Sequence, residues 1–236
     1  MTLKIGVLGG MGPYAALDFM RVLLERSPAK KESEHFHVIL DNNPQMPSRT
    51  RAFLFREKSP SAEMEKGLIR LMSAGVDFVV SPCNSAHHFL PEIIARLNIP
   101  FLDMIEATAR KVKLSGCQTV GVIAGEVTVG AKLYENQLLG TGINIIHLSE
   151  DEQPLVRQII EDVKLDNINS NTVCLFEQVL KSLEQQKCES IILGCTELRS
   201  VSLLSENCEI TCIDSITALA DACINRATLP EETSPS

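Results

Sequence analysis

Residues 77–85 read DFVVSPCNS, and residues 190–197 read SIILGCTE. Each stretch has an apolar run, then a cysteine, then a hydroxyl side chain within two residues, and a helical pattern follows. The two cysteines, Cys83 and Cys195, are 112 positions apart. A short continuous apolar run is typical of a strand that is buried in a parallel sheet. The two stretches therefore predict two equivalent units of strand, cysteine and helix.

Other segments repeat at nearly the same offset. The sequence GVLGG at 6–10 matches GVIAG at 121–125, and FLD at 101–103 matches CID at 212–214. The three matches occur in the same order in both halves of the chain, which indicates a duplicated unit. We expect one cysteine from each copy to face a shared cleft.

Strand patterns and helical patterns alternate along the whole chain, which is typical of an α/β fold. We expect two similar doubly wound domains with parallel four-stranded sheets, related by pseudo-symmetry, with the active site in the cleft between them. The expected strands lie near 3–9, 36–41, 77–82, 99–102, 118–124, 143–148, 189–194 and 209–213. The expected helices lie at 14–26, 60–74, 86–97, 104–113, 129–140, 152–163, 171–186 and 215–226.

The same patterns predict where the chain changes domain. We expect it to cross near residues 100–105 and to return near 213–216, so that the last helix packs on the first domain. The first domain then comprises 1–103 plus 214–228, and the second comprises 104–213. Residues 229–236 are rich in proline, glutamate, serine and threonine, and we expect them to form a flexible tail.

Composition narrows the class of protein. Of 236 residues, 44% are hydrophobic and 22% are charged, which is ordinary for a globular protein. The net charge of −8 gives no electrostatic support for nucleic-acid binding, and no apolar run reaches the ~18 residues that span a bilayer. Eight cysteines without a signal-peptide pattern favour reduced thiols in the cytoplasm. We therefore expect a cytoplasmic protein with a small-molecule partner, and neither nucleic acid nor membrane.

The position of the two cysteines after a strand and before a helix favours a catalytic role for their thiols. A thiol at the start of a helix lies near unpaired N–H groups, which stabilise the thiolate and lower its pKa from the free value of ~8.5. We expect Ser85 and Thr196 to cap these two helices. Two opposed thiols can remove a proton from one face of a carbon and deliver one to the other face, as stereoinversion requires. The alternative is a pair of structural cysteines packed at helix starts.

Two long connections, 41–60 and 149–171, carry further polar residues. Arg49 follows two prolines in the first connection, and Lys164 lies in the second. Each is expected to bind a carboxylate, and the alternative for each is a solvated surface charge. His87 could orient the thiol or the substrate, or could be a structural histidine.

A glycine-rich segment, GGMGP at 9–13, can present backbone N–H groups to a ligand. It also resembles a loose dinucleotide fingerprint, which leaves a nicotinamide-dependent oxidoreductase as an alternative. Pro13 is unusual in that motif, and Asp41 lies beyond the usual spacing of about 20 residues.

Four motifs together resemble the aspartate/glutamate racemase family of cofactor-independent amino-acid racemases. They are IGVLGGMGP at 5–13, NPQMPSRT at 43–50, CNSAH at 83–87 and GCTEL at 194–198. The resemblance implies that Cys83 and Cys195 form a two-base catalytic pair, and that the protein is a homodimer. It also implies substrate-binding roles for Met11, Arg49, Thr50, Asn84, Ser85, Lys164 and Thr196.

The chain departs from the family pattern at three places. Ser85 stands where threonine is commoner, and Ser48 stands where an aspartate often precedes the arginine. The segment GEVT at 125–128 replaces the more usual Gly-Thr start of the second half, a change that is expected to affect substrate fit.

The sequence therefore predicts a racemase that interconverts L- and D-aspartate, or glutamate, without pyridoxal phosphate or metal. Relatives with one catalytic cysteine decarboxylate or isomerise other dicarboxylates, and this reaction class is one alternative. The retention of both cysteines favours racemisation. A further alternative is a non-catalytic binder of an acidic amino acid, which would need the cations but not the thiols.

Overall fold

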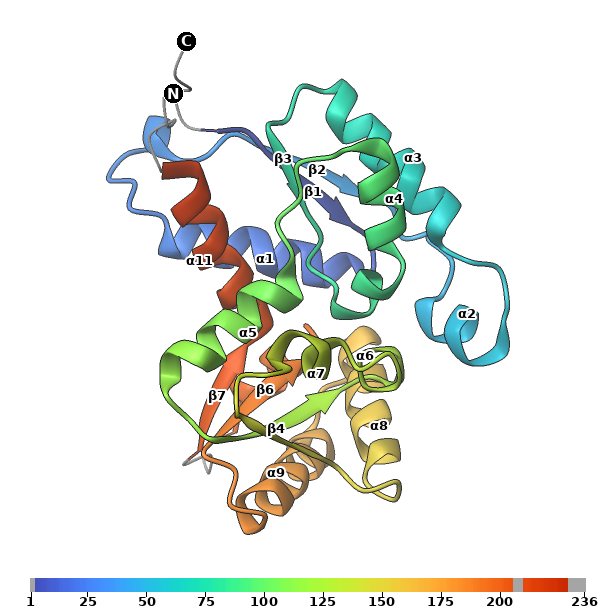
Figure 1. Ribbon diagram of the computed structural model, residues 1–236, viewed down its shortest axis with the longest axis vertical. Helices are drawn as coiled ribbons and strands as arrows, with labels where there is room; N and C mark the ends of the chain where they lie inside the picture. Colours follow the sequence, from blue (N-terminus) through green and yellow to red (C-terminus); the bar gives the residue numbers. More distant parts are fainter. Residues whose placement is uncertain (1–2, 206–209, 229–236) are drawn as a thin grey trace.

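Two parallel β-sheets, each with helices on both faces, form the protein in a computed structural model that describes residues 3–205 and 210–228 (Figure 1). The first sheet has the order β2-β1-β3 and the second has the order β5-β4-β6-β7. Their strands are β1 (Ile5–Gly9), β2 (Val38–Asn42), β3 (Phe78–Val80), β4 (Thr119–Ala124), β5 (Asn144–His147), β6 (Ser190–Gly194) and β7 (Thr211–Asp214). The predicted fold class, two α/β units with parallel sheets, is confirmed, except that the first sheet has three strands where four were predicted.

The two sheets repeat each other in topology and in register. β1 and β4 are flanked in the same way, β1 by β2 and β3, and β4 by β5 and β6. Gly6 of β1 pairs with Val79, and Gly121 of β4 pairs with Ile191. Val79 and Ile191 are themselves 112 positions apart, which is the offset of the two cysteines. The duplicated sequence pattern therefore corresponds to a duplicated strand register.

The strand predicted at 99–102 is reduced to a single bridge between Val79 and Phe101. The Val79 N–H donates to the Pro100 carbonyl at 2.8 Å, and the Leu102 N–H donates to the Val79 carbonyl at 3.0 Å. This bridge lies beside β3 as β7 lies beside β6, so the prediction was wrong only in length. Pro100 offers no N–H, and the chain enters a helix at Met104.

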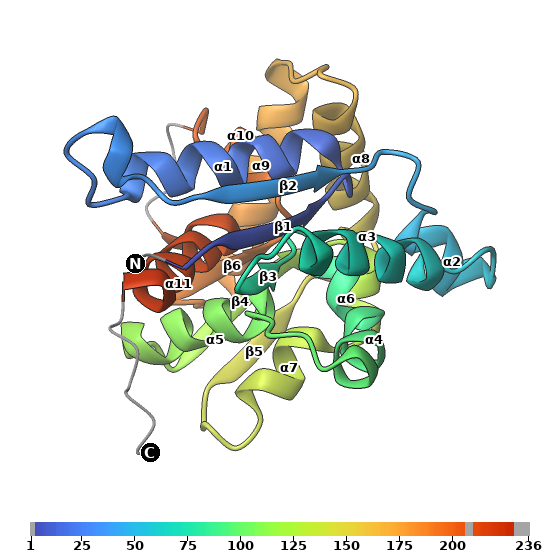
Figure 2. The same ribbon diagram turned by 90° about the horizontal axis from the view of Figure 1, so that it is seen from above.

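Helices α1 (Pro13–Arg26) and α11 (Ser215–Thr228) cover one face of the first sheet, and α3 (Ser61–Ser73) and α4 (Leu90–Leu97) cover the other. Ile216 and Leu219 of α11 join Ile5 and Phe19 in one buried cluster. Figure 2 shows α1 next to β2 and α3 next to β3. The last helix therefore packs on the first sheet, as the sequence predicted.

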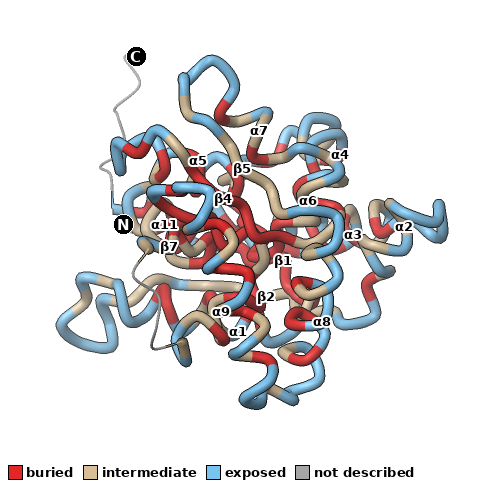
Figure 3. Tube along the Cα trace, turned by 90° about the horizontal axis from the view of Figure 1, so that it is seen from below, coloured by how far each residue is buried: buried red, intermediate tan, exposed pale blue. Residues whose placement is uncertain are grey.

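The second sheet is covered by α5 (Met104–Ser115), α6 (Glu126–Gly130) and α7 (Leu133–Leu138) on one face. Its other face is covered by α8 (Gln153–Lys164), α9 (Ser170–Gln185) and α10 (Leu198–Ser202). In Figure 3 the buried residues run along the central strands β1 and β4, whereas the outer strand β2 is only half-buried. None of the helices within residues 3–205 and 210–228 has both the length and the apolarity needed to cross a membrane.

Two predicted helices need correction, and two short helices were not predicted. The helix predicted at 86–97 is a five-residue 3-10 helix, η2 (Asn84–His88), followed by α4, with Phe89 between them. The helix predicted at 129–140 is α6 and α7, because Lys132 adopts a left-handed conformation with φ 52°. The sequence did not predict α2 (Arg49–Phe55) or η1 (Glu32–Glu34), which lie in segments expected to be loops.

Helices α5 and α11 lie at the junction of the two units, where the chain crosses and returns (Figure 1). Asp221 of α11 accepts a hydrogen bond from Arg26 of α1 and pairs with Lys111 of α5 at 2.6 Å. We propose that the two units are domains with the boundaries 1–103 plus 214–228 and 104–213. The tail predicted at 229–236 lies outside the described residues.

Candidate active site

A cavity of about 420 Å³ opens between the two units, next to the carboxyl ends of β3, β4 and β6. Ligands bind at this end of the strands in α/β folds, and small-molecule sites enclose roughly 300–1,000 Å³. All nine predicted site residues line the cavity: Met11, Arg49, Thr50, Cys83, Asn84, Ser85, Lys164, Cys195 and Thr196. The structure thus brings together residues from both halves of the sequence.

Cys83 follows β3 and is buried at the start of η2. Its sulfur lies 3.4 Å from the hydroxyl oxygen of Ser85. His87 supports the backbone of this segment, since its Nε2 accepts the N–H of Met104 at 3.0 Å and its Nδ1 lies 2.9 Å from the Cys83 carbonyl oxygen. With Nε2 accepting, Nδ1 carries the proton and donates to that carbonyl. His87 therefore joins the Cys83 segment to the start of α5, rather than contacting the thiol.

Cys195 follows β6 and faces a carboxylate. Its thiol donates to Oε2 of Glu197 at 3.0 Å, and the hydroxyl of Thr196 donates to the same oxygen at 3.0 Å. Removal from bulk water raises the pKa of the Cys195 thiol well above its ordinary value, and the Glu197 charge raises this pKa further. The charge of Lys164 opposes the rise in part. The thiol is therefore the resting form of Cys195.

This finding corrects the prediction that a helix start lowers the pKa of Cys195. The helix after Cys195 is the five-residue α10, which begins at Leu198 with Glu197 as its N-cap residue, so a negative charge stands where a positive helix end was expected. The predicted caps are wrong as well. The N-cap residues are Cys83 for η2 and Glu197 for α10, and neither helix start has a side-chain capping hydrogen bond. Instead, Ser85 lies beside the Cys83 thiol, and Thr196 donates to the Glu197 carboxylate.

A buried hydrogen-bond chain connects the two cysteine segments. The Tyr134 hydroxyl donates to Oδ1 of Asn84 at 2.5 Å, and Nδ2 of Asn84 donates to Oγ of Ser215 at 3.0 Å. The Ser215 hydroxyl then donates to the carbonyl of Leu193, two residues before Cys195, at 3.0 Å. Buried polar groups that are paired in this way hold a single arrangement. The side-chain oxygen of Asn84 and one of its amide N–H groups thus form hydrogen bonds within the protein. The second amide N–H is available to a ligand.

Tyr134 also contacts the second segment directly. A Cβ atom added to Gly194 would lie 2.9 Å from Cε2 of the Tyr134 ring, so a larger residue at this position would displace the ring. The tyrosine is fully buried, and desolvation raises the pKa of its hydroxyl, which stays protonated as the donor to Asn84. A single side chain of α7 thereby fixes the spacing of both cysteine segments.

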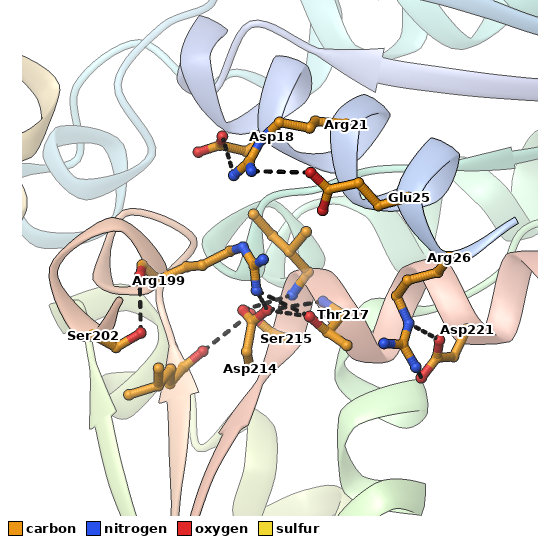
Figure 4. Close-up of polar contacts among 12 residues, drawn as sticks. Asp18, Arg21, Glu25, Arg26, Arg199, Ser202, Asp214, Ser215, Thr217 and Asp221 are labelled. Carbon is orange, nitrogen blue, oxygen red and sulfur yellow. Dashed lines mark hydrogen bonds and ion pairs between the residues drawn. The ribbon is translucent and has the colours of Figure 1, made fainter. Parts of the chain in front are cut away.

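A polar cluster anchors the chain after Cys195. Figure 4 shows Arg199 of α10 directed toward Asp214 and Thr217, at the point where β7 leads into α11. Nη1 of Arg199 lies 2.7 Å from Oδ2 of Asp214 and 3.1 Å from the Thr217 hydroxyl. Both charged side chains are largely buried, which fixes α10, and with it the Cys195 segment, to the returning chain.

Arg49 lies in the first turn of α2, which forms one wall of the cavity. The Phe53 ring of the same helix packs against Gly130 of α6 and lies 5.0 Å from the His88 ring, so α2 touches both units. Nη1 of Arg49 reaches the Pro47 carbonyl at 3.4 Å, whereas its Nε is buried without a hydrogen-bond partner among the described residues. An unpaired buried N–H of a cation favours an anionic ligand.

Lys164 is the last residue of α8 and lies exposed at the cavity wall. Two further cavity cations are already paired, because Arg51 binds Glu57 and Arg157 binds Glu126. Within the described ranges, Arg49 and Lys164 are the cavity cations without a carboxylate partner. They come from different units and approach the cavity from two sides.

Sequence reasoning missed four residues of the site: Glu126, Tyr134, Arg157 and Glu197. Glu197 could have been found, since it stands two residues after Cys195 as Ser85 stands two residues after Cys83. Tyr134 gave no signal, because it resembles any apolar residue of an amphipathic helix. Glu126 was noted as a departure from a family pattern, but its partner Arg157 lies 31 residues away.

Comparison with known proteins defines the class as an isomerase. Residues 8–223 match the sequence model of the family described as Asp/Glu/Hydantoin racemase. The chain belongs to the Asp/Glu/hydantoin racemase family, so the predicted family and enzyme class are confirmed.

Relatives and solved structures agree with this family. The broad specificity amino-acid racemase RacX of Bacillus subtilis is 29% identical over 229 residues, which cover 94% of this chain and 96% of RacX. The aspartate racemase of Picrophilus torridus superposes with a TM-score of 0.85 at 30% identity, covering 95% of this chain and 94% of that one. Glutamate racemase of Francisella tularensis in complex with D-glutamate shares the fold, with a TM-score of 0.69 at 18% identity, covering 95% and 81% of the two chains.

Proposed function

We propose that this protein racemises aspartate by a two-base mechanism, in which Cys83 and Cys195 act on opposite faces of Cα. The observation that carries the proposal is that one cysteine from each repeated unit lines the same cavity. The likeness to the aspartate racemase of Picrophilus torridus supports the choice of substrate. Glutamate, one methylene longer, is the second substrate to test.

The proposed reaction moves one proton from carbon and one proton to carbon. The thiolate of one cysteine takes the Cα proton and becomes a thiol, and the electron pair left on Cα spreads into the α-carboxylate. The thiol of the other cysteine then donates its proton to the opposite face of Cα and becomes a thiolate. The amino acid leaves inverted, and the two cysteines have exchanged protonation states.

Glu197 gives the two cysteines different starting states. Because the Cys195 thiol donates to Glu197 and its pKa is raised, Cys195 begins as the acid, and the two-base mechanism then assigns the role of base to Cys83. In the reverse direction Cys195 must act as the base. Glu197 can then accept the thiol proton across the same 3.0 Å hydrogen bond, while Cys83 takes up a proton from solvent so that it can serve as the acid, and Glu197 returns its proton to solvent after turnover. We therefore assign Glu197 as the proton acceptor for Cys195.

The charges of the cavity support an acidic substrate. Arg49 and Lys164, which lack carboxylate partners among the described residues, are assigned to the side-chain carboxylate. Asn84, Ser85 and Thr196 are assigned to the α-carboxylate and ammonium, whose binding fixes Cα between the sulfurs. Charge that develops on the α-carboxylate as the proton leaves needs such hydrogen-bond donors.

The glycine-rich segment has a packing role that weakens the nicotinamide alternative. Gly10 has φ +83°, and a Cβ atom there would lie 2.1 Å from the backbone oxygen of Asn43. Only glycine fits this conformation and this close contact. The segment therefore needs no dinucleotide to explain its glycines.

The test is direct. Purified protein, dialysed against a chelator and supplied with no pyridoxal phosphate, is incubated with L-aspartate or L-glutamate, and the enantiomers are separated by chiral chromatography. We expect D-aspartate to form until both enantiomers are equal. Formation of D-aspartate only after pyridoxal phosphate or a divalent metal is added would contradict the proposal, as would release of carbon dioxide in place of the D-enantiomer.

A further inference from the structure

The ion pair between Glu126 and Arg157 lies in the wall of the same cavity as the two cysteines. Glu126 is the first residue of α6, and its Oε1 accepts a hydrogen bond from Nε of Arg157 on α8. The Glu126 side chain is 15% exposed and the Arg157 side chain is 53% exposed. A largely buried carboxylate therefore holds a solvent-accessible guanidinium against the cavity wall.

One face of α8 carries the charges of this wall. Arg157, Glu161 and Lys164 follow one another at helical spacing, and all three line the cavity. Arg157 lies two turns, or about 10 Å, from Lys164 along the helix. Arg157 is thus close enough to the substrate region to act as a further cation of the cavity. Its charge is offset mainly by the hydrogen-bonded carboxylate of Glu126 and more weakly by the charge of Glu161, and both acids line the cavity.

We propose that the Glu126–Arg157 pair sets the selectivity of the enzyme for the charge of the substrate side chain. The inference rests on the proposed racemase function. While Glu126 holds Arg157, the cavity offers two unpaired cations, Arg49 and Lys164, and an uncharged side chain of the same shape is tolerated. Without the Glu126 charge, the Arg157 guanidinium loses its hydrogen-bonded carboxylate and keeps only the weaker influence of Glu161, so it becomes a third cation that favours dicarboxylic amino acids. Without Arg157, the bare carboxylate of Glu126 repels them.

The experiment compares L-aspartate with L-asparagine, which has the same shape but no side-chain charge. The ratio of kcat/KM for aspartate to that for asparagine is measured in wild type, E126Q and R157Q. We expect the ratio to rise about tenfold in E126Q and to fall about tenfold in R157Q, the size of one charge-assisted contact. General damage to the fold would lower turnover of both substrates alike and leave the ratio unchanged.

E65Q is the matched control. Glu65 of α3 pairs with Arg96 of α4 at 2.7 Å, and both residues lie outside the cavity lining. We expect the ratio of E65Q to equal that of wild type. Equal ratios in wild type, E126Q and R157Q, or a shift in the same direction in both variants, would overturn the inference.

A binding measurement separates this inference from the proposed function. The dissociation constants of succinate and of its monoamide, succinamate, are measured by calorimetry in the same four proteins. We expect E126Q to tighten succinate relative to succinamate and R157Q to weaken it. If the two variants show these opposite shifts but the wild-type protein racemises no amino acid, the racemase function is refuted and the charge selectivity is supported. Racemisation without the shifts would refute the selectivity alone.

Discussion

The segments around Cys83 and Cys195 occupy the same place in the two units, yet their chemistry differs. Each cysteine follows the strand that pairs with the glycine of the central strand, in the same register. Two residues later the units diverge, because the first unit has the hydroxyl of Ser85 and the second has the carboxylate of Glu197. One thiol therefore faces a neutral neighbour and the other faces a negative one.

This difference shows that duplication positions the two thiols, while burial and one divergent residue, Glu197, raise the pKa of Cys195. The backbone repeat explains why both cysteines reach one cavity. It does not explain why the pKa of Cys195 is raised, since burial and the Glu197 charge cause that rise. A racemase that works in both directions must let each cysteine serve as acid and as base. We infer that Glu197 stands beside Cys195, whose thiol pKa is raised, as its proton acceptor for this reason.

The largest expected effect is the loss of either cysteine. We expect C83A and C195A each to abolish racemisation, because one face of Cα then has no acid or base. Each variant is expected to exchange the Cα proton of one enantiomer only, and the two variants should differ in which one. C174A, which removes an exposed cysteine of α9, is the control and should match wild type. Racemisation at a near wild-type rate in C83A or C195A would contradict the claim that both cysteines are needed.

The next largest effect is expected from substitution of Glu197, which differs from Ser85, the residue at the equivalent position of the first unit. We expect E197Q to lower kcat about 100-fold in the direction that uses Cys195 as the base, because general base catalysis contributes about 10²–10⁴-fold. S85A removes the neutral contact to the Cys83 sulfur at 3.4 Å and one hydroxyl that is assigned to the substrate, so it should cost about 1.5 kcal/mol, alike in both directions. The initial rates from L- and D-aspartate check both variants. An equal loss in S85A and E197Q would mean that the two sites are equivalent after all.

The cations should contribute less than the acid–base groups. We expect R49A and K164A each to raise the free-energy barrier for aspartate by about 1.5–3 kcal/mol, the value of one charge-assisted hydrogen bond. Thermal unfolding should change little, since Lys164 is exposed and Arg49 donates, among the described residues, a single hydrogen bond to the Pro47 carbonyl. R21A is the control, as Arg21 forms exposed ion pairs on α1 outside the cavity lining. Unchanged aspartate kinetics in R49A and K164A would leave both residues as ordinary surface charges.

The smallest effect is a shift along the pH axis. In C83A, we expect alkylation of Cys195 by iodoacetamide to accelerate only above the ordinary thiol pKa of about 8.5, because burial and Glu197 both favour the thiol. Adding E197Q removes one of these causes, so the curve should move to lower pH while burial still holds it above the ordinary value. Rates are followed by mass spectrometry of the Cys195 peptide. A shift to higher pH in E197Q would contradict the assigned cause.

Much of the fold could be predicted because continuous apolar runs mark buried parallel strands. The offset of 112 between the cysteines anticipated the repeated register. The exceptions have local causes. The strand at 99–102 is cut short by Pro100, and α2 begins directly after a proline-rich stretch that resembled a loop. Neither effect is visible in hydrophobic periodicity, which was the main signal used.

The site could be predicted in composition but not in electrostatics. All nine expected residues line one cavity, because each lies after a strand or in a long connection. The raised pKa of Cys195 depends on burial and on the direction of the Glu197 side chain, which sequence does not give. Tyr134 joins the two cysteine segments only after folding. The roles of the nine residues, the homodimer and the cytoplasmic location stay predictions.

The most direct test of the two-base account is the fate of the Cα hydrogen in D2O. The enzyme is mixed with protiated L-aspartate in D2O, and both enantiomers are analysed by mass spectrometry after a small fraction has reacted. We predict that the D-aspartate formed carries deuterium at Cα while the remaining L-aspartate keeps protium, because one cysteine removes the proton and the other delivers a solvent-derived deuteron. D-aspartate that retains the original protium would contradict this account, since it would mean that a single base returned the same proton to the opposite face.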